Sequence, residues 1–232
     1  MDLVTSGFRQ AIALIAGADH QIWGILWLSL QVSGSATLIA LALGVPAGAG
    51  LALARFPGRG LVVSAGNTGM GLPPVVVGLF LTLLLWRGGP LGHLEVLYTP
   101  AAIVLAQAVI AVPIVTGITL AAVGQVPREF RLQLLALGAS RIQMVWMVLR
   151  EARLPMLAAV MAGFGGIISE IGASMMVGGN IKGQTRTLTT AMVLETGKGN
   201  FDVAIALSLL LLVLIFIVNW ALTTIQQRRV PG

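Results

Sequence analysis

Cysteine is absent from this sequence and charged residues are few. Among 232 residues there is no Cys, and Asp, Glu, Lys and Arg together make up 9%, whereas 57% of the residues are hydrophobic. Disulfides and thiolate metal sites are therefore excluded. A soluble domain carries about 25% charged residues, so the composition predicts a protein that lies largely within a membrane.

Residue patterns for catalysis and nucleotide binding are also missing. A phosphate-binding loop needs a Lys followed by Ser or Thr, but Lys182 precedes Gly183 and Lys198 precedes Gly199. No HExxH motif or pair of acids offers hydrolysis, and the two histidines, His20 and His93, are expected at membrane interfaces. We expect no catalytic residue, metal or cofactor on this chain, so any energy must come from an ion gradient or a partner.

Long apolar runs indicate five membrane spans. A helix needs about 20 apolar residues to cross a bilayer, and continuous rather than alternating hydrophobicity argues against strands. The expected spans, in an all-α membrane protein, are residues 25–54, 61–86, 99–123, 156–177 and 201–225. No signal peptide is evident, because Met1 to Gly7 has no Lys or Arg. Leu3 to Gly17 can form a short surface helix.

The distribution of cations predicts the orientation. With a cytoplasmic carboxyl terminus, nine Arg residues fall on the inner side and five Lys or Arg residues outside, as the positive-inside rule requires. The amino terminus is then external. We expect an external or interfacial segment at 1–24, a transmembrane domain at 25–227 and a cytoplasmic tail at 228–232. A basic cytoplasmic rim accounts for the net charge of +6, so no nucleic-acid partner is expected.

Small and proline residues interrupt the expected spans. Gly44 and Gly48 have the spacing that lets helices approach closely. Pro73 and Pro74, after Gly71, remove two backbone donors and predict a kink or break. In lipid, a break must face protein or a water-filled cavity, so we favour a pore-lining position over a kink that serves packing alone.

One acid, Glu170, interrupts the fourth span. A charge near the bilayer centre costs about 2.5–3.5 kcal/mol. We favour a buried, hydrogen-bonded role near a gate, with Ser169, Ser174 or a second copy of the chain as partner. The alternative is hydration at an outer helix end. The candidate gate residues are Gly71, Pro73, Pro74, Glu170 and Ser174.

A charged segment, residues 124–155, separates the third and fourth spans. It holds seven charged residues, and its apolar positions recur at helical spacing at Leu134, Leu137, Ile142, Val145 and Trp146. We expect two short amphipathic helices that break near Gly138, on the cytoplasmic side. A hairpin lying on lipid headgroups is the alternative.

Several motifs resemble those of a known family. Gly138-Ala139-Ser140-Arg141, followed by Leu154-Pro155, resembles the coupling loop of binding-protein-dependent ABC importer permeases, although Leu132-Gln133-Leu134 stands where that family has Glu-Ala-Ala. Other segments resemble the oxyanion permeases of the molybdate, sulfate and tungstate kind: Gly71 to Gly78, Ser169 to Ala173 and Asn180 to Thr187. Met175 to Asn180 and Leu194 to Asp202 look most like the tungstate branch.

The resemblance implies a type I, MetI-like permease of the cytoplasmic membrane with five spans and a cytoplasmic coupling helix. It implies a homodimer, two ATPase subunits that carry ATP and Mg²⁺, and an extracytoplasmic binding protein. Leu137, Gly138, Ala139, Ser140 and Arg141 would contact the ATPase.

The external loop between the last two spans has two possible roles. Lys182, Gln184, Thr185 and Arg186 would either assist access of the anion or dock the binding protein.

Tungstate is the expected substrate, with molybdate or sulfate as alternatives. An ion-coupled secondary transporter is less favoured, because Glu170 alone could carry the ion. A structural membrane anchor would leave the coupling motif and the proline break unexplained.

Overall fold

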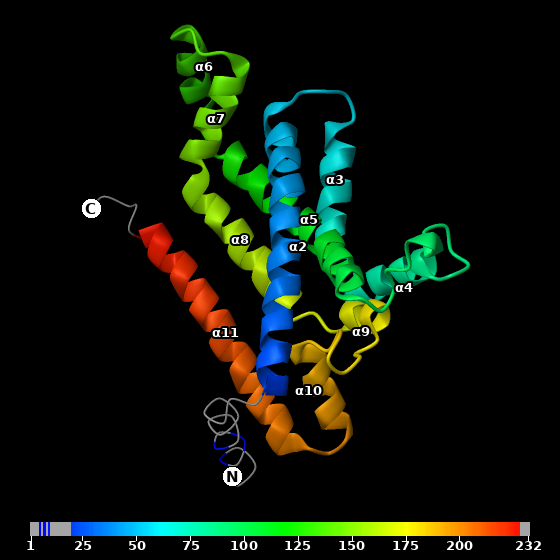
Figure 1. The fold of residues 1–232 in the computed structure, drawn as a ribbon. Coiled ribbons are helices and arrows are strands. Elements are labelled where there is room, and N and C mark those ends of the chain that lie inside the picture. Colours follow the sequence, from blue (N-terminus) through cyan, green and yellow to red (C-terminus); the bar gives the residue numbers. More distant parts are fainter. Residues whose placement is uncertain (1–4, 6, 8, 10–19, 228–232) are drawn as a thin grey trace.

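The structure is a computed structural model that describes residues 5, 7, 9 and 20–227, and this part of the chain contains helices and no strand. The predicted surface helix from Leu3 to Gly17 and the tail at 228–232 lie outside the described residues, apart from positions 5, 7 and 9. The elements in order are α2 (His20–Leu53), α3 (Arg59–Met70), α4 (Pro74–Leu85), the short η1 (Gly92–Leu94), α5 (Pro100–Gly124), α6 (Arg128–Ala136), α7 (Arg141–Glu151), α8 (Arg153–Ile168), α9 (Gly172–Gly178), α10 (Leu188–Gly197) and α11 (Phe201–Gln227) (Figure 1).

Helices α2 and α5 form the central pair of the bundle. A Cβ atom on Gly48 would lie 2.5 Å from the backbone oxygen of Thr116, and one on Gly44 would lie 2.8 Å from the Val115 side chain. Only glycine allows this separation, so the close approach predicted from the spacing of Gly44 and Gly48 is confirmed. Helix α8 packs on the same pair, and α11 runs from α10 along one side of the bundle toward the level of α8 (Figure 1).

The number of spans lies between three and five. Among the described residues, α2, α5 and α11 are individually long and apolar enough to cross a membrane. Two bent helix pairs qualify when each is counted as one span: α3 with α4, bent by 97°, and α7 with α8, bent by 69°. The five predicted spans agree with the upper limit in number, although the second bent pair covers residues 141–168 and the predicted fourth span was 156–177.

The predicted second span is broken, as the prolines indicate, and its two halves are nearly perpendicular. Helix α3 ends at Met70 and α4 begins at Pro74, where a missing N–H costs nothing because the first turn of a helix has no acceptor for it. Helix α4 therefore projects sideways from the bundle (Figure 1).

The predicted fourth span is not one helix, which corrects the expected continuous run at 156–177. Helix α8 ends at Ile168 and α9 begins at Gly172. The Ser169 hydroxyl donates back to the carbonyls of Gly165 and Gly166, at 2.9 and 3.1 Å, and such local bonds compete with helix continuation. Because the break depends on these hydrogen bonds, the apolar composition of the segment could not predict it.

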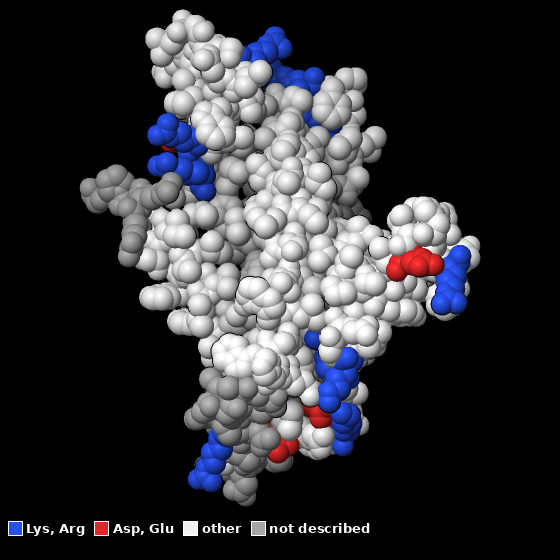
Figure 2. Space-filling view, viewed as in Figure 1, with Lys and Arg blue, Asp and Glu red and all other residues white. Residues whose placement is uncertain are grey.

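Charged side chains lie at the ends of the molecule and on its lateral projection. Figure 2 shows Lys and Arg around the α6–α7 end and again near α10, with a broad uncharged zone between them. Large apolar side chains are exposed in that zone, including Leu38 on α2, Phe80 on α4 and Phe216 on α11. An exposed apolar belt between charged ends is typical of a protein that is embedded in a bilayer.

Candidate functional site

The coupling segment, residues 128–151, contains the two predicted helices. Helix α6 ends at Ala136, and Gly138 turns the chain with φ +86°. The N–H of Ala139 donates to the Leu134 carbonyl at 3.0 Å, and Ser140 then caps α7 in a capping box with Gln143. The predicted break near Gly138 is confirmed, and Gly138 occupies the left-handed region that other residues avoid.

Several large apolar side chains of the coupling segment are exposed. Leu137 is 84% exposed, Ile142 83% and Trp146 68%. Helix α6 has no buried residue, and α7 buries only Val148. Leu137, Gly138, Ala139, Ile142 and Trp146 line one shallow groove. The turn between α6 and α7 lies at one end of the molecule (Figure 1), and exposed apolar surface of this kind is typical of interaction sites.

The two broken spans meet each other. Helix α4 packs on α9 so closely that a Cβ on Gly78 would lie 2.8 Å from the Ala173 Cα, and one on Gly172 would lie 2.7 Å from the Val75 side chain. The structure therefore brings the Gly71–Pro74 break and the break at residues 169–171 to one region of the bundle. The sequence did not predict that the two interruptions would be neighbours.

Glu170 stabilises the start of α9. Its Oε1 accepts the N–H of Ala173 at 3.1 Å, and its backbone carbonyl accepts the Thr189 hydroxyl at 3.1 Å. Within this chain the carboxylate thus pairs with a backbone N–H rather than with Ser169 or Ser174. Ser174 is buried beside another side chain, Gln107.

Sequence reasoning missed Gln107, a buried amide on α5. Its Nε2 donates to the Ile167 carbonyl at 3.1 Å and lies 3.5 Å from the Ser174 Oγ. Ile167 is in the last turn of α8, and its carbonyl also accepts the N–H of Glu170 at 3.1 Å, so Gln107 is a second donor to it. The signal was the single amide within the predicted span at residues 99–123, since a polar side chain in a span needs a partner.

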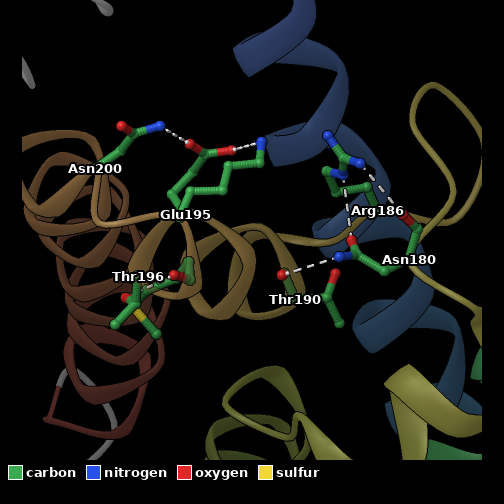
Figure 3. Close-up of polar contacts among 8 residues, drawn as sticks. Asn180, Arg186, Thr190, Glu195, Thr196 and Asn200 are labelled. Atoms are coloured by element: carbon green, nitrogen blue, oxygen red, sulfur yellow. Dashed lines mark hydrogen bonds and ion pairs between the residues drawn. The ribbon is translucent and has the colours of Figure 1, made fainter.

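The loop at residues 179–187, which was predicted to be external and is called the outer loop below, is held by internal hydrogen bonds. Arg186 donates through Nε to Asn180 Oδ1 at 3.2 Å and through Nη2 to the Asn180 carbonyl at 3.3 Å. Asn180 in turn donates to the Thr190 carbonyl on α10 at 3.3 Å (Figure 3). Arg186 is therefore fixed in orientation and half-buried, whereas Lys182 and Gln184 are exposed.

Thr185 is a buried residue of this loop. It is fully buried, donates to the Gly178 carbonyl at 2.6 Å and accepts from the Ile181 N–H at 2.9 Å. Its position stabilises the loop and keeps its hydroxyl away from the surface.

A second polar cluster lies at the C-terminal end of α10. Glu195 accepts from Asn200 at 2.8 Å and pairs with Lys198 at 2.7 Å (Figure 3). The hydrogen bond from Asn200, followed by that from Lys198, lowers the pKa of Glu195 below its usual 4.5. No group of His, Asp or Glu in the described residues could hold a metal ion.

The helical bundle and the exposed coupling segment define a membrane permease. The chain belongs to the family described as the binding-protein-dependent transport system inner membrane component, whose model matches residues 40–230. Members of this family are permease subunits and not themselves enzymes.

Three similarities extend over most of the chain. It is 42% identical over 210 residues to a "Probable anion ABC transporter permease protein" of Haloferax volcanii, covering 88% of this chain and 90% of the relative. It is 36% identical over 227 residues to the tungstate uptake system permease protein TupB of Peptoclostridium acidaminophilum, covering 98% and 100%. The fold resembles a chain of the MetNI methionine ABC transporter in an inward-facing conformation, with a TM-score of 0.74 and 20% identity over 91% of this chain and 96% of that one.

Proposed function

We propose that this chain is the permease subunit of an ATP-driven importer that passes a tetrahedral oxyanion, tungstate first, across the cytoplasmic membrane. The observation that carries this proposal is the similarity to a tungstate uptake permease along 98% of the chain. The relative named for an anion supports the wider substrate class. Molybdate and sulfate are the alternative substrates within that class.

The exposed coupling segment supports a partner that supplies the energy. Two copies of the chain would enclose the passage, and two cytoplasmic ATPases, holding ATP and Mg²⁺, would bind residues 137–141. The amino terminus and the outer loop would then be external, where an extracytoplasmic binding protein delivers the anion. Closure of the ATPases would move the coupling segments and open the passage outward, by alternating access.

An ion-coupled secondary transporter is less well supported. Such a carrier needs ionisable groups within its spans to bind the coupling ion. Glu170 is the acid available there, and its carboxylate caps α9. The unpacked apolar surface around Leu137 would also have no role.

Reconstitution tests the proposal directly. The permease, its ATPase and its binding protein are placed in liposomes, and uptake of tungstate, molybdate and sulfate is measured with ATP. We expect ATP-dependent uptake of tungstate that stops when the ATPase is inactivated by mutation. Equal uptake without ATP would contradict the importer, and uptake of molybdate or sulfate alone would reassign the substrate.

Two roles for the outer cations can be separated by kinetics. If Lys182 and Arg186 assist access of the anion, the Lys182→Gln, Arg186→Gln pair should lower the maximal transport rate at saturating loaded binding protein. If they dock the binding protein, the apparent affinity should fall and the maximal rate should not change. Arg186 also orders the loop through Asn180, so Lys182→Gln alone is the cleaner measurement.

A further inference from the structure

The outer loop and α2 enclose a pocket that the sequence did not indicate. Its volume is about 390 Å³, which leaves room for a small anion and several waters. Its walls include His20, Trp27 and Gln31 from α2, and Lys182, Gln184 and Arg186 from the loop. The α2 residues lie on one helix face, because they recur at helical spacing, and Figure 3 shows Arg186 beside that helix.

The lining of the pocket is cationic. Lys182 and Arg186 contribute two positive charges, and none of the described residues that line it is Asp or Glu. Glu195 is close enough to interact electrostatically with Arg186, but its carboxylate is already occupied by Lys198 and Asn200. Among the described residues, no carboxylate in the lining neutralises the positive charge of the pocket.

The geometry of Arg186 suits an oxyanion. Its hydrogen bonds to Asn180 engage Nε and Nη2, which fixes the guanidinium plane and leaves Nη1 to donate to a ligand. The amide groups of Gln31 and Gln184 are further donors at the rim. A preorganised guanidinium loses less conformational freedom on binding than an unrestrained one.

We propose that this pocket binds a tetrahedral oxyanion group at the outer end of α2. Two sources share that chemistry. One is the transported dianion, held outside the membrane before it enters the passage, and this case rests on the proposed function. The other is the phosphate of a phospholipid headgroup, whose chains would lie along the exposed Trp27, which is 63% exposed and of the type that anchors at membrane interfaces.

The test uses the permease–ATPase complex without its binding protein. Binding of radiolabelled tungstate is measured by equilibrium dialysis, and retention of added phosphatidylglycerol by native mass spectrometry. Lys182→Glu should weaken the affinity for whichever probe binds by about tenfold or more, because the Coulomb attraction of a partly hydrated ion pair is replaced by repulsion. Arg87→Glu, with the same change in net charge at an exposed residue outside the pocket, should change binding by less than about twofold.

The outcomes distinguish the two sources of the oxyanion group, and they also test the proposal itself. Retained tungstate assigns the pocket to the dianion, and retained lipid without tungstate assigns it to a headgroup. Lys182→Arg should keep binding in either case, which guards against a folding defect in Lys182→Glu. If wild type binds neither probe, or Arg87→Glu weakens binding as much as Lys182→Glu does, the pocket is not an oxyanion site. ATP-dependent uptake by the wild type would still support the proposed function in that event.

Discussion

The coupling segment consists of two short helices joined by a turn, whereas the outer loop is irregular, and the two regions treat their side chains in opposite ways. Residues 128–151 expose large apolar side chains and bury almost none. In residues 179–187, by contrast, the Thr185 hydroxyl is buried and hydrogen-bonded, and Arg186 donates a hydrogen bond to Asn180. A surface that must dock on a protein keeps apolar area available, whereas a loop that must keep its shape in water satisfies its polar groups internally.

The largest expected effect is at the turn of the coupling segment. Gly138→Leu places a side chain at φ +86°, which costs about 1–2 kcal/mol for an L-residue and rotates Leu137 relative to α7. We expect insertion to persist and binding-protein-stimulated ATPase activity to be lost in proteoliposomes.

The control for this experiment is Gly138→Asn. Asparagine tolerates the left-handed region, and open space surrounds the position, so stimulation should largely return. Normal stimulation in Gly138→Leu would show that the turn does not matter for coupling.

The stability of the outer loop should depend on the buried Thr185 hydroxyl. Thr185→Val keeps the shape of the side chain but leaves the Gly178 carbonyl and the Ile181 N–H without their partner, which costs about 1–3 kcal/mol. We expect a lower thermal unfolding midpoint and faster proteolysis within residues 179–187. Thr196→Val, at an exposed hydroxyl that bonds only within α10, should change stability by about 0.5 kcal/mol or less.

Glu170 sits between these two regions and should show an intermediate effect. Glu170→Gln keeps an oxygen that can accept the Ala173 N–H, so assembly and most of the transport should be retained. Glu170→Leu removes the cap of α9 and should cost about 1 kcal/mol, with impaired assembly and transport. Quantitative purification of the complex and uptake assays would measure both, and a fully active Leu variant would refute a structural role for the carboxylate.

The smallest effect concerns pH at the end of α10. The pKa of Glu195 is lowered in the folded protein, so its interactions add stability above the unfolded pKa, and this contribution is lost as the pH falls through the lowered value. Hydrogen exchange in residues 195–200 should therefore gain extra opening below pH 4.5. Glu195→Gln should abolish that pH dependence, and an unchanged profile would mean that the ion pair does not order the segment.

Much of the architecture could be predicted from local sequence. Long apolar runs identified α2, α5 and α11, and two adjacent prolines identified the break between α3 and α4, because the missing backbone donors are a local property. Gly138 between two amphipathic patterns likewise marked the turn of the coupling segment. The interruption of the fourth span escaped prediction, since it depends on Ser169 bonding back to its own helix and on Glu170 capping the next one.

What the sequence by itself determined is the class of protein, the apolar length of its main helices and the turn at Gly138 between two short helices. These follow from composition, periodicity and backbone chemistry, which act over a few residues. Only the tertiary structure decided that α4 packs on α9, that Gln107 satisfies a carbonyl of α8, and that Lys182 and Arg186 face α2 across a pocket. Those arrangements join residues far apart in the chain, and their partners are chosen by packing and hydrogen bonding that no local pattern encodes.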